Sequence, residues 1–92
     1  MPTKCEEEHL LLRRGLGRTV RRLRRDQDAS QADFAARAGL AANHLGEVER
    51  ASRGLTLQTI VSLASALDMQ VSELLARAEE SAREQVVARQ EP

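Results

Sequence analysis

The residues of this chain that could do chemistry are concentrated in one stretch, SQADFAARAGLAANHLGEVER, which runs from Ser30 to Arg50. Its second half carries an amide, an imidazole and a carboxylate on Asn43, His44 and Glu47. In the groove of a duplex, an asparagine can pair bidentately with adenine, a histidine can donate to guanine N7 or a phosphate, and a glutamate can accept from cytosine N4. Glu47 could equally hold Arg50 or another arginine in position, because phosphates repel a carboxylate that meets no donor.

The spacing of residues elsewhere does not support other chemistry. Cys5 and His9 lie four positions apart, as two ligands on one helix would, but two ligands without further candidates make a poor zinc site. The sequence contains no Ser/His/Asp set, no glycine-rich phosphate loop and no carboxylate pair in a pocket-forming context. We therefore expect no bound metal, no cofactor and no enzymatic activity.

Small and apolar residues in the same stretch predict two short helices joined at one glycine. Counted from Gln31, the fifth residue is Ala35, the ninth Gly39, the fifteenth Leu45 and the eighteenth Val48. A small fifth residue permits close approach of the helices, glycine permits a left-handed turn, and the two aliphatic residues hold the second helix across the first. This arrangement is typical of a helix-turn-helix unit that reads DNA. The exposed face of its second helix is expected to hold Ala42, Asn43, His44, Gly46, Glu47 and Arg50.

The composition favours an all-α fold around this unit. The 92 residues include 14 alanines and 13 leucines but one Phe and no Tyr or Trp, so helix propensity exceeds strand propensity. The formal net charge is zero, yet seven arginines and no acid lie between Arg13 and Arg25, which creates a local positive field. One cysteine excludes an intramolecular disulfide, and no apolar run is long enough for a signal peptide or a membrane span. We expect a cytoplasmic protein without membrane contact.

Periodic apolar residues predict five helices. The first reaches about Arg25 and carries the basic face, but its start is not defined, and Gly15 and Gly17 weaken its continuity. Ser30 can cap the second helix, the third begins near Ala42, Thr56 can cap the fourth, and the longer fifth begins near Val71. We divide the chain into an N-terminal extension with helical character (residues 1–15), a helix-turn-helix domain (16–76) and a C-terminal helical tail (77–92).

Four segments between Leu16 and Leu75 carry a family resemblance: LGRTVRRLRR, SQADFAARAGL, NHLGEVER and LTLQTIVSLASALDMQVSELL. Together they resemble the Cro and phage-repressor type of helix-turn-helix regulator, the xenobiotic-response-element family. The resemblance implies a five-helix, lambda-repressor-like domain with an extended C-terminal helix. It also implies binding to double-stranded operator DNA, usually by a dimer.

The resemblance assigns roles to individual residues. It places Gln31 against a phosphate or base edge and turns Ala42, Asn43, His44 and Glu47 toward the major groove, where the Ala42 methyl can pack on a thymine methyl. The residues that follow the recognition helix and begin the fourth helix can contact phosphates. These expected phosphate contacts are Arg50, Ser52, Arg53, Thr56 and Thr59.

Arg24 and Glu49 occupy positions where the family often has a salt bridge between the first and third helices. The chain also departs from the family. Ala41 stands where a capping Ser or Thr is common, and Ala51 stands where a glycine is usual. These departures concern local stability more than the fold.

The fifth helix carries more apolar surface than one small domain needs. A second copy is the simplest partner, because a two-fold interface is self-complementary and can set two recognition helices about 34 Å apart. The alternative is a solvated helix after Ala78. The expected dimer surface comprises Leu74, Leu75, Ala78, Ala82 and Val86.

These features favour a sequence-specific transcriptional regulator, either a phage-type repressor or a controller protein of a restriction–modification operon. It would act as a homodimer on a pseudo-palindromic operator. The alternative is an antitoxin whose tail grips a toxin, or an adaptor that keeps the fold without binding DNA. The residues do not predict the operator, the sign of regulation or an effector.

Overall fold

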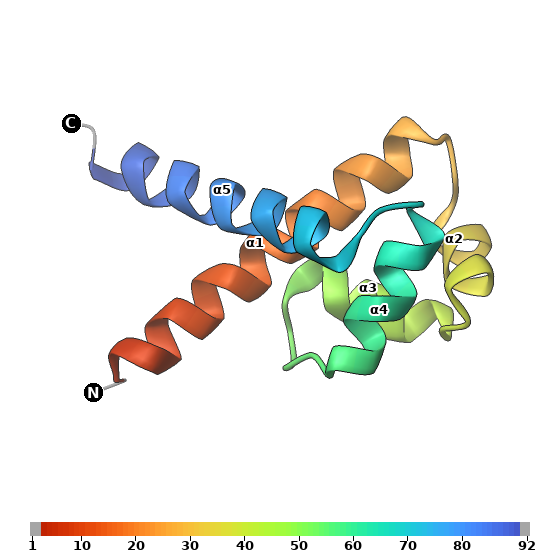
Figure 1. The fold of residues 1–92 in the computed structure, drawn as a ribbon, viewed down its shortest axis with the longest axis horizontal. Helices are drawn as coiled ribbons and strands as arrows, with labels where there is room; N and C mark the ends of the chain where they lie inside the picture. Colours follow the sequence, from red (N-terminus) through yellow and green to blue (C-terminus); the bar gives the residue numbers. More distant parts are fainter. Residues whose placement is uncertain (1–2, 91–92) are drawn as a thin grey trace.

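The computed structural model of the chain describes residues 3–90, and these form five helices and no strand. The prediction of an all-α, five-helix fold is confirmed. The second helix begins after Ser30 and ends before Gly39, as these two residues predict, and the third begins at Ala42 as expected. Figure 1 shows their arrangement. The helices are α1 (Lys4–Asp26), α2 (Gln31–Ala38), α3 (Ala42–Arg50), α4 (Leu57–Ala66) and α5 (Val71–Gln90).

The first helix is continuous from Lys4, so the extension expected at residues 1–15 is part of α1 as far as it is described. Its start is set by a capping box, in which the Thr3 hydroxyl accepts from the Glu6 amide and the Glu6 carboxylate accepts from the Thr3 amide. Gly15 and Gly17 do not interrupt the helix. They are instead the two points at which other helices cross it.

Each of these glycines is required by a close backbone approach. A Cβ on Gly15 would overlap the carbonyl oxygen of Ala78 in α5. A Cβ on Gly17 would lie 2.6 Å from the carbonyl oxygen of Val48 in α3. Because real Cβ atoms do not approach that closely, only glycine permits both crossings without displacing α3 or α5.

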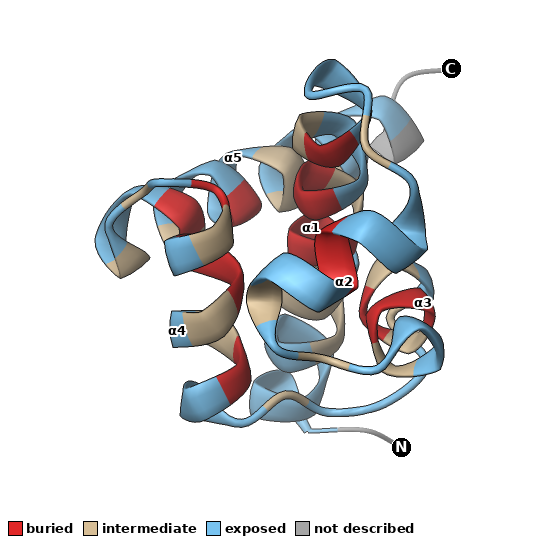
Figure 2. Cartoon of the chain, turned by 90° about the vertical axis from the view of Figure 1, so that its right-hand side faces the viewer, coloured by how far each residue is buried: buried red, intermediate tan, exposed pale blue. Residues whose placement is uncertain are grey.

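The hydrophobic core lies where the five helices meet, and all five contribute to it (Figure 2). Phe34 from α2 is completely buried and is the largest side chain in the core. The other core residues share almost complete burial. They are Leu16, Val20, Ala35, Leu45, Val48, Leu63, Ala64, Leu67, Leu74 and Ala78.

The position of α5 corrects part of the expected dimer surface. Leu74 and Ala78 are both 0% exposed, so neither can contact a second copy of the chain. The prediction is wrong for these two residues because the core of the monomer extends along α5 beyond Leu75, as far as Ala78. The missing side chain at Gly15 lets α5 approach α1 so closely that Ala78 is covered within the monomer. Leu75, Ala82 and Val86 remain partly exposed.

Beyond this crossing, α1 and α5 diverge. The N-terminal turns of α1 and the C-terminal turns of α5 project away from the other helices, toward the same end of the molecule (Figure 1). We call these segments the α1 arm (residues 4–12) and the α5 arm (residues 79–88). No single helix in the described chain is both long and apolar enough to span a membrane, although α4 and α5 pass that test together across a 98° bend.

Candidate nucleic-acid interface

The turn between α2 and α3 has the geometry that its glycine predicts. The Ser30 hydroxyl caps α2 by accepting from the Asp33 amide at 3.0 Å. Gly39 ends the helix in the left-handed region with φ 72°, and the Leu40 amide then donates to the Ala35 carbonyl at 2.8 Å. These bonds satisfy carbonyls at the end of α2 and start α3 after two further residues. The helix-turn-helix spacing is thereby confirmed.

The turn fixes which face of α3 points outward. Leu45 and Val48 are at most 1% exposed and lock α3 against the core. On the other side of the helix, Ala42 and Asn43 are exposed, whereas His44 and Glu47 are half-buried. The predicted base-reading residues of α3 therefore lie together on one accessible face.

Gly46 does not belong to that face, contrary to the expectation. It is buried, and a Cβ there would lie 2.9 Å from Nη1 of Arg50. The long Arg50 side chain folds back along α3 and covers the glycine, which a count of exposed positions on a helix does not anticipate. Arg50 thus presents its guanidinium beside the middle of the recognition helix.

Glu47 is held by an arginine, which was one of the two alternatives left open for it. Arg53 Nη1 lies 2.9 Å from Glu47 Oε2. The hydrogen bond from Arg53, followed by the positive charges of Arg53 and Arg50, holds the pKa of Glu47 below its ordinary value. Glu47 therefore remains an ionised acceptor whose negative charge is offset by Arg53.

Arg24 and Glu49 form the expected ion pair, and it is almost completely buried. Arg24 Nε donates to Glu49 Oε2 at 2.7 Å, and Nη2 donates to Oε1 at 3.0 Å. The remaining Arg24 nitrogen, Nη1, donates to the Ala29 carbonyl at 2.9 Å. This bidentate pair ties α1 to the C-terminal part of α3 and to the turn that precedes α2.

Gln31 contributes to this network. Its Nε2 donates to Glu49 Oε1 at 2.9 Å, so that its amide points toward the α1–α3 junction. Burial raises the pKa of Glu49, but the hydrogen bonds from Arg24 and Gln31 and the charges of Arg24 and Arg21 lower it by more. The net pKa of Glu49 lies below the ordinary value of 4.5.

The arginine run of α1 serves several purposes. Arg24 is used in the buried pair, and Arg18 binds α5, donating from Nε to the Ser81 hydroxyl at 3.0 Å and from Nη2 to the Ser81 carbonyl at 3.1 Å. Nothing in the sequence marked Arg18 as different from its neighbours, because the contact spans 63 positions. The exposed members are Arg14, Arg21, Arg22 and Arg25.

Arg21 and Arg25 join Arg50 at a second polar feature. Together with Gln31 and the Arg24–Glu49 pair they line a hollow of about 380 Å³ at the N-terminus of α2. Since Glu49 is already bound by Arg24, the hollow carries an excess of positive charge. Its position next to α3 makes it suited to an anion such as a backbone phosphate.

The expected phosphate contacts after α3 are only partly accessible. Ser52 is exposed, with its amide and hydroxyl donating to the Glu47 carbonyl at 3.0 and 3.3 Å, and Arg53 is exposed but paired with Glu47. The role expected of Thr59 is corrected, because Thr59 is 7% exposed and its amide donates to the Thr56 hydroxyl at 3.1 Å. Both threonine hydroxyls are used in capping α4.

The two departures from the family pattern lie at the ends of α3. Ala41 occupies the N-cap position and makes no side-chain cap, which leaves the first-turn amides without that acceptor. Ala51 ends the helix in the left-handed region with φ 56°, a conformation that glycine adopts with less strain. Both ends of the helix form without their usual residues, while Leu45 and Val48 pack in the core.

An all-α domain in which a glycine turn presents one locked helix, flanked by arginines, defines the class of helix-turn-helix proteins. The chain belongs to the helix-turn-helix domain family, which matches residues 15–78. Over 62 residues it is 40% identical to control protein C.SmaI of Serratia marcescens, covering 67% of this chain and 74% of that protein.

Solved structures show the same likeness. The clp gene regulator ClgR of Corynebacterium glutamicum superposes with a TM-score of 0.78 at 26% identity, covering 85% of this chain and 83% of that one. The restriction-modification controller protein C.AhdI of Aeromonas hydrophila superposes with a TM-score of 0.64 at 37% identity, covering 67% and 94%. The resemblance to Cro-type regulators is confirmed, and these relatives are controllers and regulators rather than enzymes.

Proposed function

We propose that the chain is a sequence-specific transcriptional regulator of the controller type, which reads the major groove with α3 and acts as a dimer on a pseudo-palindromic operator. One observation carries the proposal. The turn at Gly39 and the buried pair Leu45 and Val48 present Asn43 and its neighbours on a single outward face of a fixed helix.

The chemistry of that face suits base edges. Asn43 is exposed and can pair bidentately with adenine, while the Ala42 methyl beside it can contact a thymine methyl. His44 can donate to guanine N7. Glu47 can accept from cytosine N4, and its ion pair with Arg53 reduces the repulsion that a lone carboxylate would meet near phosphates.

The flanking charge suits the phosphates on either side of the groove. Arg21, Arg25 and Arg50 line the positive hollow at the start of α2, and Arg53 and Ser52 follow the recognition helix. We propose that these groups position α3 on the duplex and that the residues of the outward face provide the specificity. Gln31 would take part by exchanging its bond to Glu49 for a contact with the DNA.

A retardation assay tests this function. The probe is the duplex upstream of the chain's own gene, compared with a random duplex of the same length at about 150 mM salt, where non-specific contacts are weakened. We expect a retarded complex with the upstream duplex at protein concentrations that leave the random duplex free. Equal binding to both, or no binding to either, would overturn the proposal and favour a protein-interaction role such as an antitoxin or adaptor.

A further inference from the structure

Gly46 lies in the middle of the helix that we propose reads DNA. It is buried, although Asn43 and Arg50, about one turn before and one turn after it, are exposed. Glycine is less favourable than alanine inside a helix, because it loses more conformational freedom on folding. Gly46 does not adopt a positive φ, so its backbone conformation does not require a glycine either. The reason for a glycine must therefore lie in what occupies the space of the missing side chain.

That space is occupied by a guanidinium group. A Cβ at Gly46 would lie 2.9 Å from Nη1 of Arg50, and the next nearest atoms are Cζ at 3.6 Å and Nη2 at 3.7 Å of the same residue. At Gly15 and Gly17, in contrast, the nearest atoms are backbone atoms of another helix. A flexible side chain can move aside, whereas packed backbone cannot. The fold therefore does not require Gly46, but the observed position of Arg50 does.

No acid holds the Arg50 guanidinium in this place. Within the described part of the chain, the guanidinium forms no ion pair and no hydrogen bond. The two acids of the same helix, Glu47 and Glu49, are already bound by other arginines. The guanidinium is thus positioned by its contact with Gly46, and its five N–H donors stay available for a ligand.

The contact with Gly46 places the Arg50 guanidinium at the positive hollow, which Arg21 and Arg25 of α1 also line. Neither of these α1 arginines forms an ion pair among the described residues. Three unpaired guanidinium groups around a hollow of about 380 Å³ repel one another, and an anion bound among them relieves that repulsion. A phosphate suits this place, because its oxygens can accept from several guanidinium groups at once.

We propose that Gly46 is a positioning residue of the DNA interface. It makes no contact with DNA itself. Its missing side chain seats the Arg50 guanidinium beside Arg21 and Arg25, so that the three arginines together bind one backbone phosphate. This role rests on the proposed function, because the duplex supplies the phosphate. The glycine thereby lowers the stability of α3 and raises the affinity for DNA.

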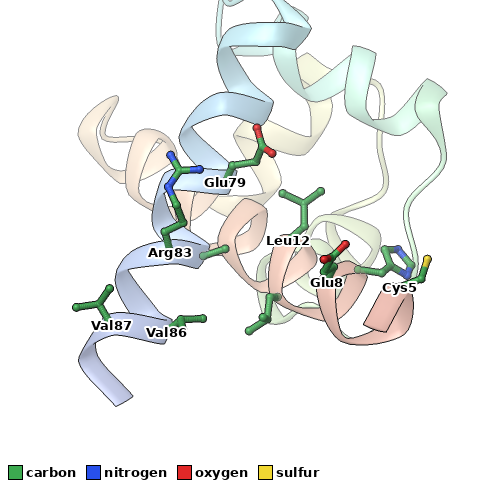
Figure 3. Close-up of a pocket in the computed structure, with 10 residues that line it drawn as sticks. Cys5, Glu8, Leu12, Glu79, Arg83, Val86 and Val87 are labelled. Carbon is green, nitrogen blue, oxygen red and sulfur yellow. The ribbon is translucent and has the colours of Figure 1, made fainter. Parts of the chain in front are cut away.

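The arms of the molecule take no part in this role. An apolar groove of about 830 Å³ lies between the α1 arm and the α5 arm (Figure 3), and Leu12, Val86 and Val87 are part of its lining. Every residue that lines the groove belongs to α1 or α5, so neither Gly46 nor Arg50 contributes to it. Substitutions at these two positions therefore leave the arms unchanged.

The substitution Gly46→Ala tests the proposal, because its methyl displaces only the end of the Arg50 side chain. We expect the affinity for the upstream duplex and for the random duplex to fall alike, by about fivefold at about 150 mM salt, which is the contribution of one released counterion. The slope of log affinity against log salt concentration should fall by about one. Gly54→Ala is the matched control and should bind as the wild type does, since the nearest atom to a Cβ there is 3.9 Å away on His9.

Thermal unfolding distinguishes a positioning role from a structural one. Gly46→Ala should unfold at the same temperature as the wild type or at a higher one, because alanine favours the helix and the displaced guanidinium belongs to a flexible side chain. A lower unfolding temperature would show that the fold needs the glycine for packing, and it would overturn the proposal.

A double-mutant cycle with Arg50→Ala shows whether Gly46 acts through Arg50. We expect Gly46→Ala to weaken binding when Arg50 is present and to cause no further loss when Arg50 is replaced by alanine. An equal loss in both backgrounds would mean that the new methyl meets the DNA directly. A Gly46→Ala chain with the affinity and salt slope of the wild type would mean that the seat is not used. Either result would overturn the proposal.

The same duplexes separate this proposal from the proposed function. If the chain binds the upstream and random duplexes equally and Gly46→Ala weakens both through Arg50, the regulator function fails and the positioning role stands. If the chain prefers the upstream duplex and Gly46→Ala binds it as tightly as the wild type does, the function stands and the positioning role fails.

Discussion

Glu49 is the residue on which three helices converge. It accepts two hydrogen bonds from Arg24 of α1 and one from Gln31 of α2, while its own backbone belongs to α3. A buried carboxylate is costly unless its hydrogen bonds are complete, and here both oxygens are used. The pair therefore sets the position of α3 relative to α1, and so contributes to the geometry of the reading surface.

Replacing only one partner of this pair should lower the free energy of unfolding more than replacing both partners with apolar residues. We expect Glu49→Ala to lower the free energy of unfolding by about 3 kcal/mol, because it leaves the Arg24 charge buried and uncompensated. The double variant Arg24→Met, Glu49→Leu should recover part of that loss. Urea unfolding of the wild type, Arg24→Met, Glu49→Leu and the double variant measures the coupling. If the losses of unfolding free energy in the two single variants add up to the loss in the double variant, the two residues do not stabilise each other.

The acid side of the stability profile should depend on the same residue. Because the pKa of Glu49 is lowered in the folded chain, its contribution is complete above the ordinary value of 4.5 and is lost as the pH falls through its folded pKa. We expect Glu49→Gln to flatten the fall in unfolding free energy below pH 4.5. Glu73→Gln is the control, since Glu73 forms its ion pair with Arg77 at the surface. If the unfolding free energy of Glu49→Gln falls with pH as steeply as that of the wild type, Glu49 does not cause the acid dependence.

At the scale of elements, the crossings of α1 decide the architecture. The backbone of α3 lies directly against Gly17, and that of α5 lies directly against Gly15. A larger residue at either position would prevent the close contact. The crossing at Gly15 buries Ala78, and the arms diverge beyond it. Both the compact domain and the apolar groove follow from these two positions.

Substitution of Gly15 tests that argument. Gly15→Ala should lower the free energy of unfolding by about 1–3 kcal/mol despite the better helix propensity of alanine, because the new methyl meets backbone that cannot turn aside. Gly54→Ala is the control, since the nearest atom to a Cβ there is 3.9 Å away on His9. Thermal unfolding compares the two. A Gly15→Ala chain as stable as the wild type would mean that α5 can move without cost.

Local signals explain which elements could be predicted from sequence. The helix ends at Ser30, Gly39 and Thr56 are each determined by the residue itself, which caps or terminates the adjacent helix. The boundaries predicted from these residues are confirmed. The start of α1 is also encoded locally, by the capping box of Thr3 and Glu6. By contrast, the burial of Ala78 and the bonds of Arg18 to α5 depend on residues far away in the chain, and no periodicity within one helix reveals them.

The same distinction applies to the site. The outward direction of Asn43 followed from the positions of Leu45 and Val48, which are near it in sequence. The burial of Gly46 could not be predicted in this way, because the Arg50 side chain that lies over it can adopt several rotamers. Thr59 is likewise not a surface residue, and its hydroxyl is hydrogen-bonded to that of Thr56.

At the scale of the whole molecule, two surfaces are kept apart. The outward face of α3 and the positive hollow beside it lie on the helix-turn-helix domain, whereas the groove lies between the arms. Each surface can therefore be altered without touching the other.

The central claim is that α3 reads base edges, and Asn43 is the residue that tests it most directly. The measurement is the affinity of the wild type, Asn43→Ala and Arg53→Ala for the upstream duplex, its single-base-pair variants and a random duplex, at fixed salt. We predict that Asn43→Ala loses about 1–3 kcal/mol on the upstream duplex and relaxes discrimination at one base pair, with little change on the random duplex. Arg53→Ala should weaken binding to all duplexes alike. An Asn43→Ala chain that loses the same affinity on the upstream and random duplexes would contradict the claim.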